Sequence, residues 1–166
     1  MSKPSEIKKK IQEIVDVKPN LPIYGVVKSV TADYCSVKIK SGLVLTDVKL
    51  KATIGGDNFI KIIPKIGTTV LLLSQTGAVD NLTVIKVDEV EKVEYSQNGL
   101  EIIVDSTDGK VSIKNNSSSL VDVLSDLVTT IKGLKVFTPV GPSGTPLPTT
   151  IASLNAFEAK FKTLLK

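Results

Sequence analysis

The sequence predicts a mainly β protein with C-terminal helices: a small β-barrel, a short β-hairpin extension and an α-helical hairpin. Apolar and polar residues alternate with a period of two across residues 23–87, as is typical of strands with one buried face. The dipeptides Asn98-Gly99 and Asp108-Gly109 have the composition of tight hairpin turns, with positive backbone angles. After Ser117, apolar residues recur at helical spacing. Together these patterns predict the order of the elements.

Residues 1–20 are expected to form an amphipathic N-terminal helix and a linker. The apolar residues at helical spacing are Ile7, Ile11, Ile14 and Val15. A helix of roughly three turns is marginally stable alone. Its apolar stripe is therefore expected to pack on the rest of the chain or on a neighbouring chain. Pro19 and Pro22 then end the helical pattern.

Residues 21–95 are predicted to form an OB-like β-barrel. The alternating pattern predicts strands at 23–30, 35–40, 44–52, 68–74 and 82–87. Five short strands separated by turn residues suit a small closed barrel, which removes exposed sheet edges. Cys35 lies in phase with Val37 and Ile39, so we expect it to be a buried core thiol.

Residues 96–116 are predicted to form the β-hairpin extension. The two hairpin dipeptides separate short strands at 93–95, 100–105 and 110–114. A unit of three short strands is marginal in isolation. It is therefore expected to pack on the barrel or on other subunits.

Residues 117–166 are predicted to form an antiparallel helical hairpin. Ser119 and Asp122 have capping-box spacing at its start. A coiled-coil-like seam is predicted at Leu120, Leu124, Leu127, Ile131 and Leu134, and a matching one at Leu154, Phe157, Phe161 and Leu164. Val121, Val123 and Val128 lie off the seam, so the apolar surface is larger than a lone hairpin can cover. The seam residues other than Leu164 are therefore candidate oligomerisation residues, buried against partner chains around a symmetry axis.

Composition argues against catalysis and against a cofactor or metal site. The chain has no histidine, no tryptophan and no arginine, which removes Ser-His-Asp and Cys-His catalysis and most zinc sites. Asp105 and Asp108 flank a predicted turn, and Asp122 and Asp126 lie on the polar side of a predicted helix. We expect neither pair to be a catalytic acid pair, and we assign no catalytic, cofactor-binding or metal-binding residue.

The distribution of charge argues against specific nucleic-acid binding. The net charge is +4, yet residues 21–95 carry nine lysines against eight acidic residues. A nearly neutral barrel releases few counterions from nucleic acid. No apolar run approaches the roughly 20 residues that cross a bilayer. We therefore expect that the chain is made in the cytoplasm and does not insert stably into a membrane.

Residues 22–116 resemble the OB-fold of the phage baseplate assembly protein V and central spike family. The resemblance rests on Gly25-Val26-Val27, on Pro64-Lys65-Ile66-Gly67-Thr68-Thr69-Val70-Leu71-Leu72-Leu73-Ser74 and on Leu82-Thr83-Val84-Ile85. In that family, G-x-V opens the first strand and P-x-x-G-x-x-V-x-V-L marks entry into a core strand. The strands at 100–115 resemble those that trail the barrel there. Spike members typically continue into a trimeric β-helix, some with a histidine-bound iron tip, whereas this chain lacks histidine and ends in predicted helices.

The resemblance implies a structural, non-enzymatic component of a phage tail or tail-like injection machine. Such a hub or spike-base protein is expected to be a homotrimer on the tail axis of the virion, in contact with tail tube, hub or spike-tip proteins. The alternative function is that of an OB-fold protein that binds single-stranded nucleic acid. That alternative needs stacking aromatics in a basic groove, and only Tyr24, Tyr34 and Phe59 lie near the barrel strands.

Overall fold

The computed structural model describes residues 6–7, 10, 21–75 and 77–166. The helix and linker predicted within residues 1–20 lie almost wholly outside the described residues. The protein is mainly β, with 43% of the described residues in strands. It divides into two compact units, residues 1–52 with 66–89 and residues 53–65 with 90–166.

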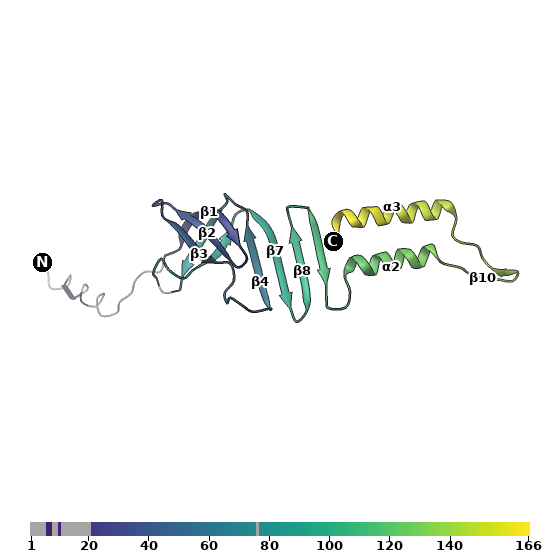
Figure 1. Cartoon of the computed structure of the whole chain (residues 1–166), viewed down its shortest axis with the longest axis horizontal. Coiled ribbons are helices and arrows are strands. Elements are labelled where there is room, and N and C mark those ends of the chain that lie inside the picture. Colours follow the sequence, from purple (N-terminus) through teal and green to yellow (C-terminus); the bar gives the residue numbers. More distant parts are fainter. Residues whose placement is uncertain (1–5, 8–9, 11–20, 76) are drawn as a thin grey trace. The chain divides into compact units, whose positions relative to one another are not determined.

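The first unit is a closed barrel with the strand order β1-β2-β3-β6-β5 (Figure 1). Its strands are β1 (Ile23–Thr31), β2 (Tyr34–Ile39), β3 (Val44–Lys49), β5 (Thr69–Ser74) and β6 (Leu82–Val87). The β3 and β6 strands run parallel and share one register pair, Lys49–Thr83, whereas the other neighbours are antiparallel. This is the strand order of an OB-type barrel, so the predicted fold class is confirmed.

Alternating side chains from all five strands fill the barrel. The most buried apolar residues are Val27, Cys35, Val37, Val48, Val70, Leu72 and Leu82. Gly25 lets β1 approach β2 closely, because a Cβ atom there would lie 2.3 Å from Cγ1 of Val37. Cys35 is 1% exposed and belongs to this core, so its predicted core position is confirmed.

The second unit begins with a four-stranded antiparallel sheet in the order β4-β7-β8-β9. Its strands are β4 (Phe59–Pro64), β7 (Val90–Gln97), β8 (Leu100–Asp105) and β9 (Lys110–Lys114). The sequence predicts the last three strands but not β4, which pairs with a strand that is distant along the chain. Residues 59–64 and 90–95 therefore belong to this sheet, although the predicted barrel segment, residues 21–95, included them.

The two predicted hairpin turns differ in the structure. Asn98 and Gly99 both have positive φ, at 51° and 82°, so the tight two-residue turn between β7 and β8 is confirmed. The turn between β8 and β9 spans residues 106–109, and of the Asp108-Gly109 pair only Gly109 has a positive φ. The two-residue expectation is wrong here because the carboxylate of Asp105 accepts hydrogen bonds from the backbone N–H and hydroxyl of Thr107 and starts the turn earlier.

The sheet leads into an antiparallel hairpin of α2 (Leu120–Lys132) and α3 (Pro148–Leu164) (Figure 1). The predicted capping box is confirmed: the Asp122 N–H donates to Oγ of Ser119 at 3.1 Å, and the Ser119 N–H donates to Oδ2 of Asp122 at 3.3 Å. Two short strands, β10 (Phe137–Thr138) and β11 (Gly141–Pro142), pair in the loop between the helices. In the described part of the chain, neither helix combines the length and apolar character needed to cross a bilayer.

Candidate assembly interface

Val128 of α2 and Phe161 of α3 are the buried apolar residues of the helical hairpin. They are the only buried residues of α2 and α3, with exposed fractions of 1% and 8%. The ring of Phe161 also meets that of Phe157 edge-on, with 5.5 Å between their centroids. The sequence places Val128 off the seam and Leu127 on it. The structure corrects this, because successive helical residues turn by about 100° and α3 covers the side of α2 that carries Val128.

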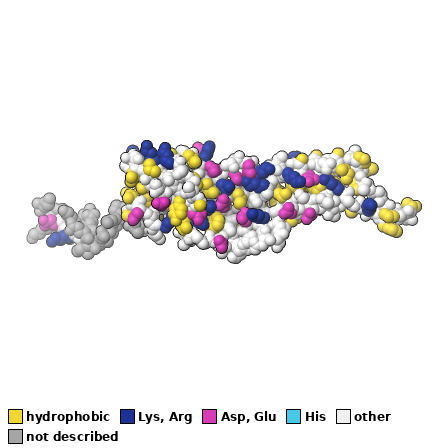
Figure 2. Space-filling model, in the orientation of Figure 1, with side chains coloured by type: hydrophobic (Ala, Val, Ile, Leu, Met, Phe, Trp, Pro, Cys, Tyr) yellow, Lys and Arg dark blue, Asp and Glu magenta, His cyan; other side chains and the backbone are white. Residues whose placement is uncertain are grey.

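A second group of apolar side chains on the hairpin remains exposed. Val123, Leu127 and Leu134 are 53%, 51% and 55% exposed, and Phe157 and Leu164 are 46% and 57% exposed. We refer to these five as the exposed hairpin residues; apolar side chains on this part of the chain are visible in Figure 2. Val123 and Leu127 lie about 40° apart around the axis of α2, and Leu134 follows the end of that helix, after Gly133. They form a stripe that α3 does not cover.

The structure divides the eight predicted oligomerisation residues into three groups. Phe161 is buried inside the hairpin; Leu120, Leu124, Ile131 and Leu154 are half-buried; Leu127, Leu134 and Phe157 are exposed. Val123, which lies off the predicted seam, and Leu164, the last residue of the predicted second seam, are also exposed. A plot of all apolar positions around each helix axis, rather than a heptad count, would have included Val123.

Both ends of the hairpin are attached to β9. Ser119, just before α2, forms an antiparallel bridge with Lys114, and Leu165, just after α3, forms a parallel bridge with Val111. The backbone N–H of Lys166 donates to the carbonyl oxygen of Val111 at 3.0 Å. The exposed hairpin residues therefore belong to a hairpin whose two ends are attached to the sheet.

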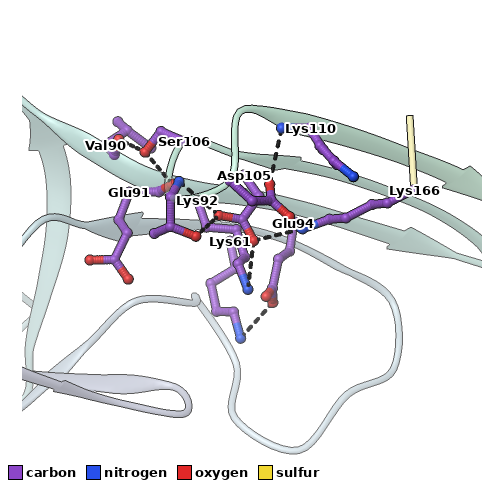
Figure 3. A network of polar contacts seen from close by, with 11 residues as sticks. Lys61, Val90, Glu91, Lys92, Glu94, Asp105, Ser106, Lys110 and Lys166 are labelled. Carbon is purple, nitrogen blue, oxygen red and sulfur yellow. Dashed lines mark hydrogen bonds and ion pairs between the residues drawn. The ribbon is translucent and has the colours of Figure 1, made fainter. Parts of the chain in front are cut away.

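A polar network reinforces this attachment (Figure 3). The Nζ atom of Lys166 donates to Oδ2 of Asp105 at 2.9 Å and to Oδ2 of Asp108 at 2.7 Å, and Nζ of Lys92 lies 3.4 Å from Oδ2 of Asp105. Hydrogen bonds from Thr107 and then from Lys166 hold the pKa of Asp105 well below its usual range, and the bond from Lys166 lowers the pKa of Asp108. Carboxyl groups with lowered pKa values remain ionised near neutral pH and cannot act as general acids there.

Ion pairs also link neighbouring strands of the sheet. Lys61 on β4 and Glu94 on β7 are direct register partners, with 2.8 Å between Nζ and Oε2 (Figure 3). Lys114 on β9 and Glu101 on β8 are likewise partners at 3.0 Å. These pairs satisfy charges on the sheet and thus have a structural explanation.

The described residues contain no group of three or more His, Cys, Asp or Glu side chains that could hold a metal ion. Burial raises the pKa of the Cys35 thiol to about 11. At neutral pH this thiol stays protonated inside the barrel, and a thiol is a much weaker nucleophile than a thiolate.

No protein-family model matches the chain, and neither a curated protein nor a solved structure matches it.

Proposed function

We propose that this chain is a structural protein that assembles with copies of itself, most simply as a trimer, through the exposed hairpin residues. The observation that carries the proposal is that five large apolar side chains are each about half exposed on a helical hairpin attached to β9. Full burial of such a side chain contributes about 1.5–3 kcal/mol. Covering all five would therefore drive association strongly.

Copies of the same chain are the simplest partners for this surface. Each copy presents the same apolar stripe on α2, and helices with such stripes bury them against one another around a rotation axis. The Lys132–Glu158 ion pair, at 2.8 Å, joins the two helices within one copy. The assembling element is thus a preformed hairpin, which lowers the entropic cost of binding.

The narrower proposal is a hub or spike-base component of a phage tail or tail-like injection machine. Its support is the resemblance of residues 22–116 to the central spike family, together with the OB-type strand order of the barrel. In this role the chain would be made in a bacterial cytoplasm and incorporated into the virion. It would contact tail tube, hub or spike-tip proteins and perform no catalysis.

Native mass measurement tests the proposed self-assembly. The chain has a mass of 17.7 kDa, so a trimer has three times that mass. A single species of one chain mass at micromolar concentration would contradict the proposal.

The second candidate function, binding of single-stranded nucleic acid, is favoured by one observation. Tyr24 is 68% exposed on the outside of the barrel, and Lys28, Lys38 and Lys40 line the same hollow. A single aromatic ring offers little base stacking, and lysine lacks the bidentate geometry of arginine. Tight binding of a thymidine oligonucleotide at physiological salt would favour this function.

A further inference from the structure

The barrel carries a basic patch on its outer surface, formed by Tyr24, Val26 and Lys28 of β1 with Lys38 of β2 and the following Lys40. These residues line a shallow hollow of about 380 Å³. Val26 lies opposite Lys38 in the sheet register. Its neighbour Val27 is fully buried in the core, so the side chain of Val26 points outward. The patch thus combines exposed apolar side chains with three positive charges.

The barrel also carries an acidic groove, formed by Val44 and Asp47 of β3 with Val79 and Asp80 of the β5–β6 loop. Its volume is about 290 Å³. The groove exists because β3 and β6 share a single register pair and leave a space beside the start of β3. Val44 and Val79 are 46% and 55% exposed there.

The β5–β6 loop is held in place beside the groove. The side-chain amide of Asn81 donates to Oε1 of Gln75 at 3.0 Å, and its oxygen accepts a hydrogen bond from Nζ of Lys49 at 2.5 Å. These hydrogen bonds connect the loop to β3 and to Gln75, which follows β5, and so fix one wall of the groove.

The charged side chains that define the two surfaces have no ion-pair partner in the described part of one chain, although the Lys49 ammonium lies at Asn81 on the edge of the acidic groove. Elsewhere on the barrel, Nζ of Lys51 pairs with Oδ2 of Asp33 at 2.8 Å. Among the described residues, the three lysines of the basic patch and the two aspartates of the acidic groove form no ion pair of this kind. The two surfaces have opposite charge, and each has an apolar centre.

We propose that the acidic groove of one copy receives Tyr24 of the next copy, with Lys38 and Lys40 beside Asp47 and Asp80. The inference rests on the proposed self-assembly and names a second contact within it. Tyrosine is a favoured anchor at interfaces, where its ring fills an apolar pocket and its hydroxyl finds a polar partner. Between Val44 and Val79 the ring would be buried, and the two carboxylates would face the lysines.

The contact must join different copies, because β1 pairs with neither β3 nor β6 and one chain cannot bring its own two surfaces together. It is heterologous, with a different surface on each side, as every interface in a cyclic trimer is. A copy of this chain is a better partner than nucleic acid, since it supplies an apolar groove for Tyr24 as well as negative charge. Nucleic acid would leave Val26 without an apolar contact.

Charge reversal on each side, separately and together, tests the contact. The variants of the full chain are Lys38→Glu/Lys40→Glu, Asp47→Lys/Asp80→Lys and the combination of all four changes. Sedimentation equilibrium should show that each double variant dissociates at a concentration at least about tenfold higher than the unmodified chain. The combined variant, with the charges exchanged, should recover most of the loss.

The matched control is Lys38→Arg/Lys40→Arg, which keeps both charges and should assemble like the unmodified chain. Tyr24→Ala should weaken assembly without any change of charge. Far-UV circular dichroism on each variant would establish that the fold is kept.

The outcomes separate this inference from the proposed function. A chain that is monomeric without any substitution would overturn both. An oligomer that neither double variant weakens would overturn the barrel contact alone, because the hairpin would then suffice. If Lys38→Glu/Lys40→Glu abolishes binding of a thymidine oligonucleotide but leaves the native mass unchanged, the basic patch is a nucleic-acid surface and the inference is wrong.

Discussion

The Nζ atom of Lys166 lies 2.9 Å from Oδ2 of Asp105. This ion pair joins Lys166, two residues after the end of α3, to the last residue of β8. The side chain of Asp105 is 7% exposed. The same ammonium group also holds Asp108 in the β8–β9 turn. One lysine therefore connects the helical hairpin to two parts of the sheet.

Replacing Lys166 with methionine should loosen this attachment. The substitution keeps an unbranched apolar stem but removes the ion pairs to Asp105 and Asp108. We expect a small decrease in melting temperature, because Asp105 keeps its contacts with Lys92 and Thr107. Thermal unfolding followed by circular dichroism measures it.

The control for this prediction is Lys135→Met. Lys135 is exposed and forms no ion pair with any residue that the structure describes. Equal melting temperatures for the two variants would show that the Lys166 pairs add nothing to stability.

Placing a carboxylate at the exposed hairpin face should break the assembly. In Leu127→Asp the charge would be buried at the interface without a partner, at a cost on the order of several kcal/mol. Native mass should fall toward that of one chain, while circular dichroism should show that much of the barrel's β-structure remains.

Thr129→Asp is the matched control, since it adds the same charge to an exposed position on the opposite side of α2. It should leave the mass unchanged. A Leu127→Asp protein that keeps its oligomeric mass would show that the hairpin is not the assembly element, and complete unfolding would show that hairpin and barrel unfold as one unit.

A methyl group at Gly25 should destabilise the barrel. In Gly25→Ala the new Cβ would lie 2.3 Å from Cγ1 of Val37 and 3.1 Å from the backbone oxygen of Lys38. Overpacking of this kind costs about 1–3 kcal/mol in the free energy of unfolding, which urea denaturation measures.

Gly56→Ala serves as its control, because a Cβ there has no neighbour within 4 Å and its φ is not positive. That variant should unfold at an unchanged urea concentration. Similar losses in both variants would mean that the contact with Val37 relaxes freely.

Acid should weaken the helical hairpin through Glu158. Hydrogen bonds from Lys132 and then Lys162 lower the pKa of Glu158 from 4.5 to about 2. A carboxyl with a lower pKa in the folded state stabilises the fold above its unfolded pKa, and this contribution is lost as the pH falls from about 4.5 toward 2. Melting temperature should therefore drop in this window.

Glu158→Gln should reduce that drop but not remove it, because Asp105 and Asp108 also have lowered pKa values. The comparison requires melting curves of the unmodified chain and of Glu158→Gln, measured both above pH 4.5 and between about pH 4.5 and 2. Parallel pH dependence in the two would refute a contribution from Glu158.

Local patterns in the sequence determined much of the fold. Alternation with a period of two predicted the five barrel strands, because each strand has one face in the core. Asn98-Gly99 predicted its turn, since both residues tolerate positive φ, and Ser119 with Asp122 predicted the start of α2. The candidate interface could be placed on the helical hairpin for the same reason: helical periodicity is visible in the sequence.

Tertiary structure alone decided the features that depend on contacts between distant segments. The pairing of β4 with β7 is non-local, so no short pattern around residues 59–64 reveals it. The apolar positions of α2 span a wide arc, and their spacing cannot say which part of that arc α3 covers. In the structure Val128 is buried and Leu127 is exposed. The bridges to β9 at both ends of the hairpin restrict how the helices can rotate about their axes, and these contacts are not visible in the local sequence.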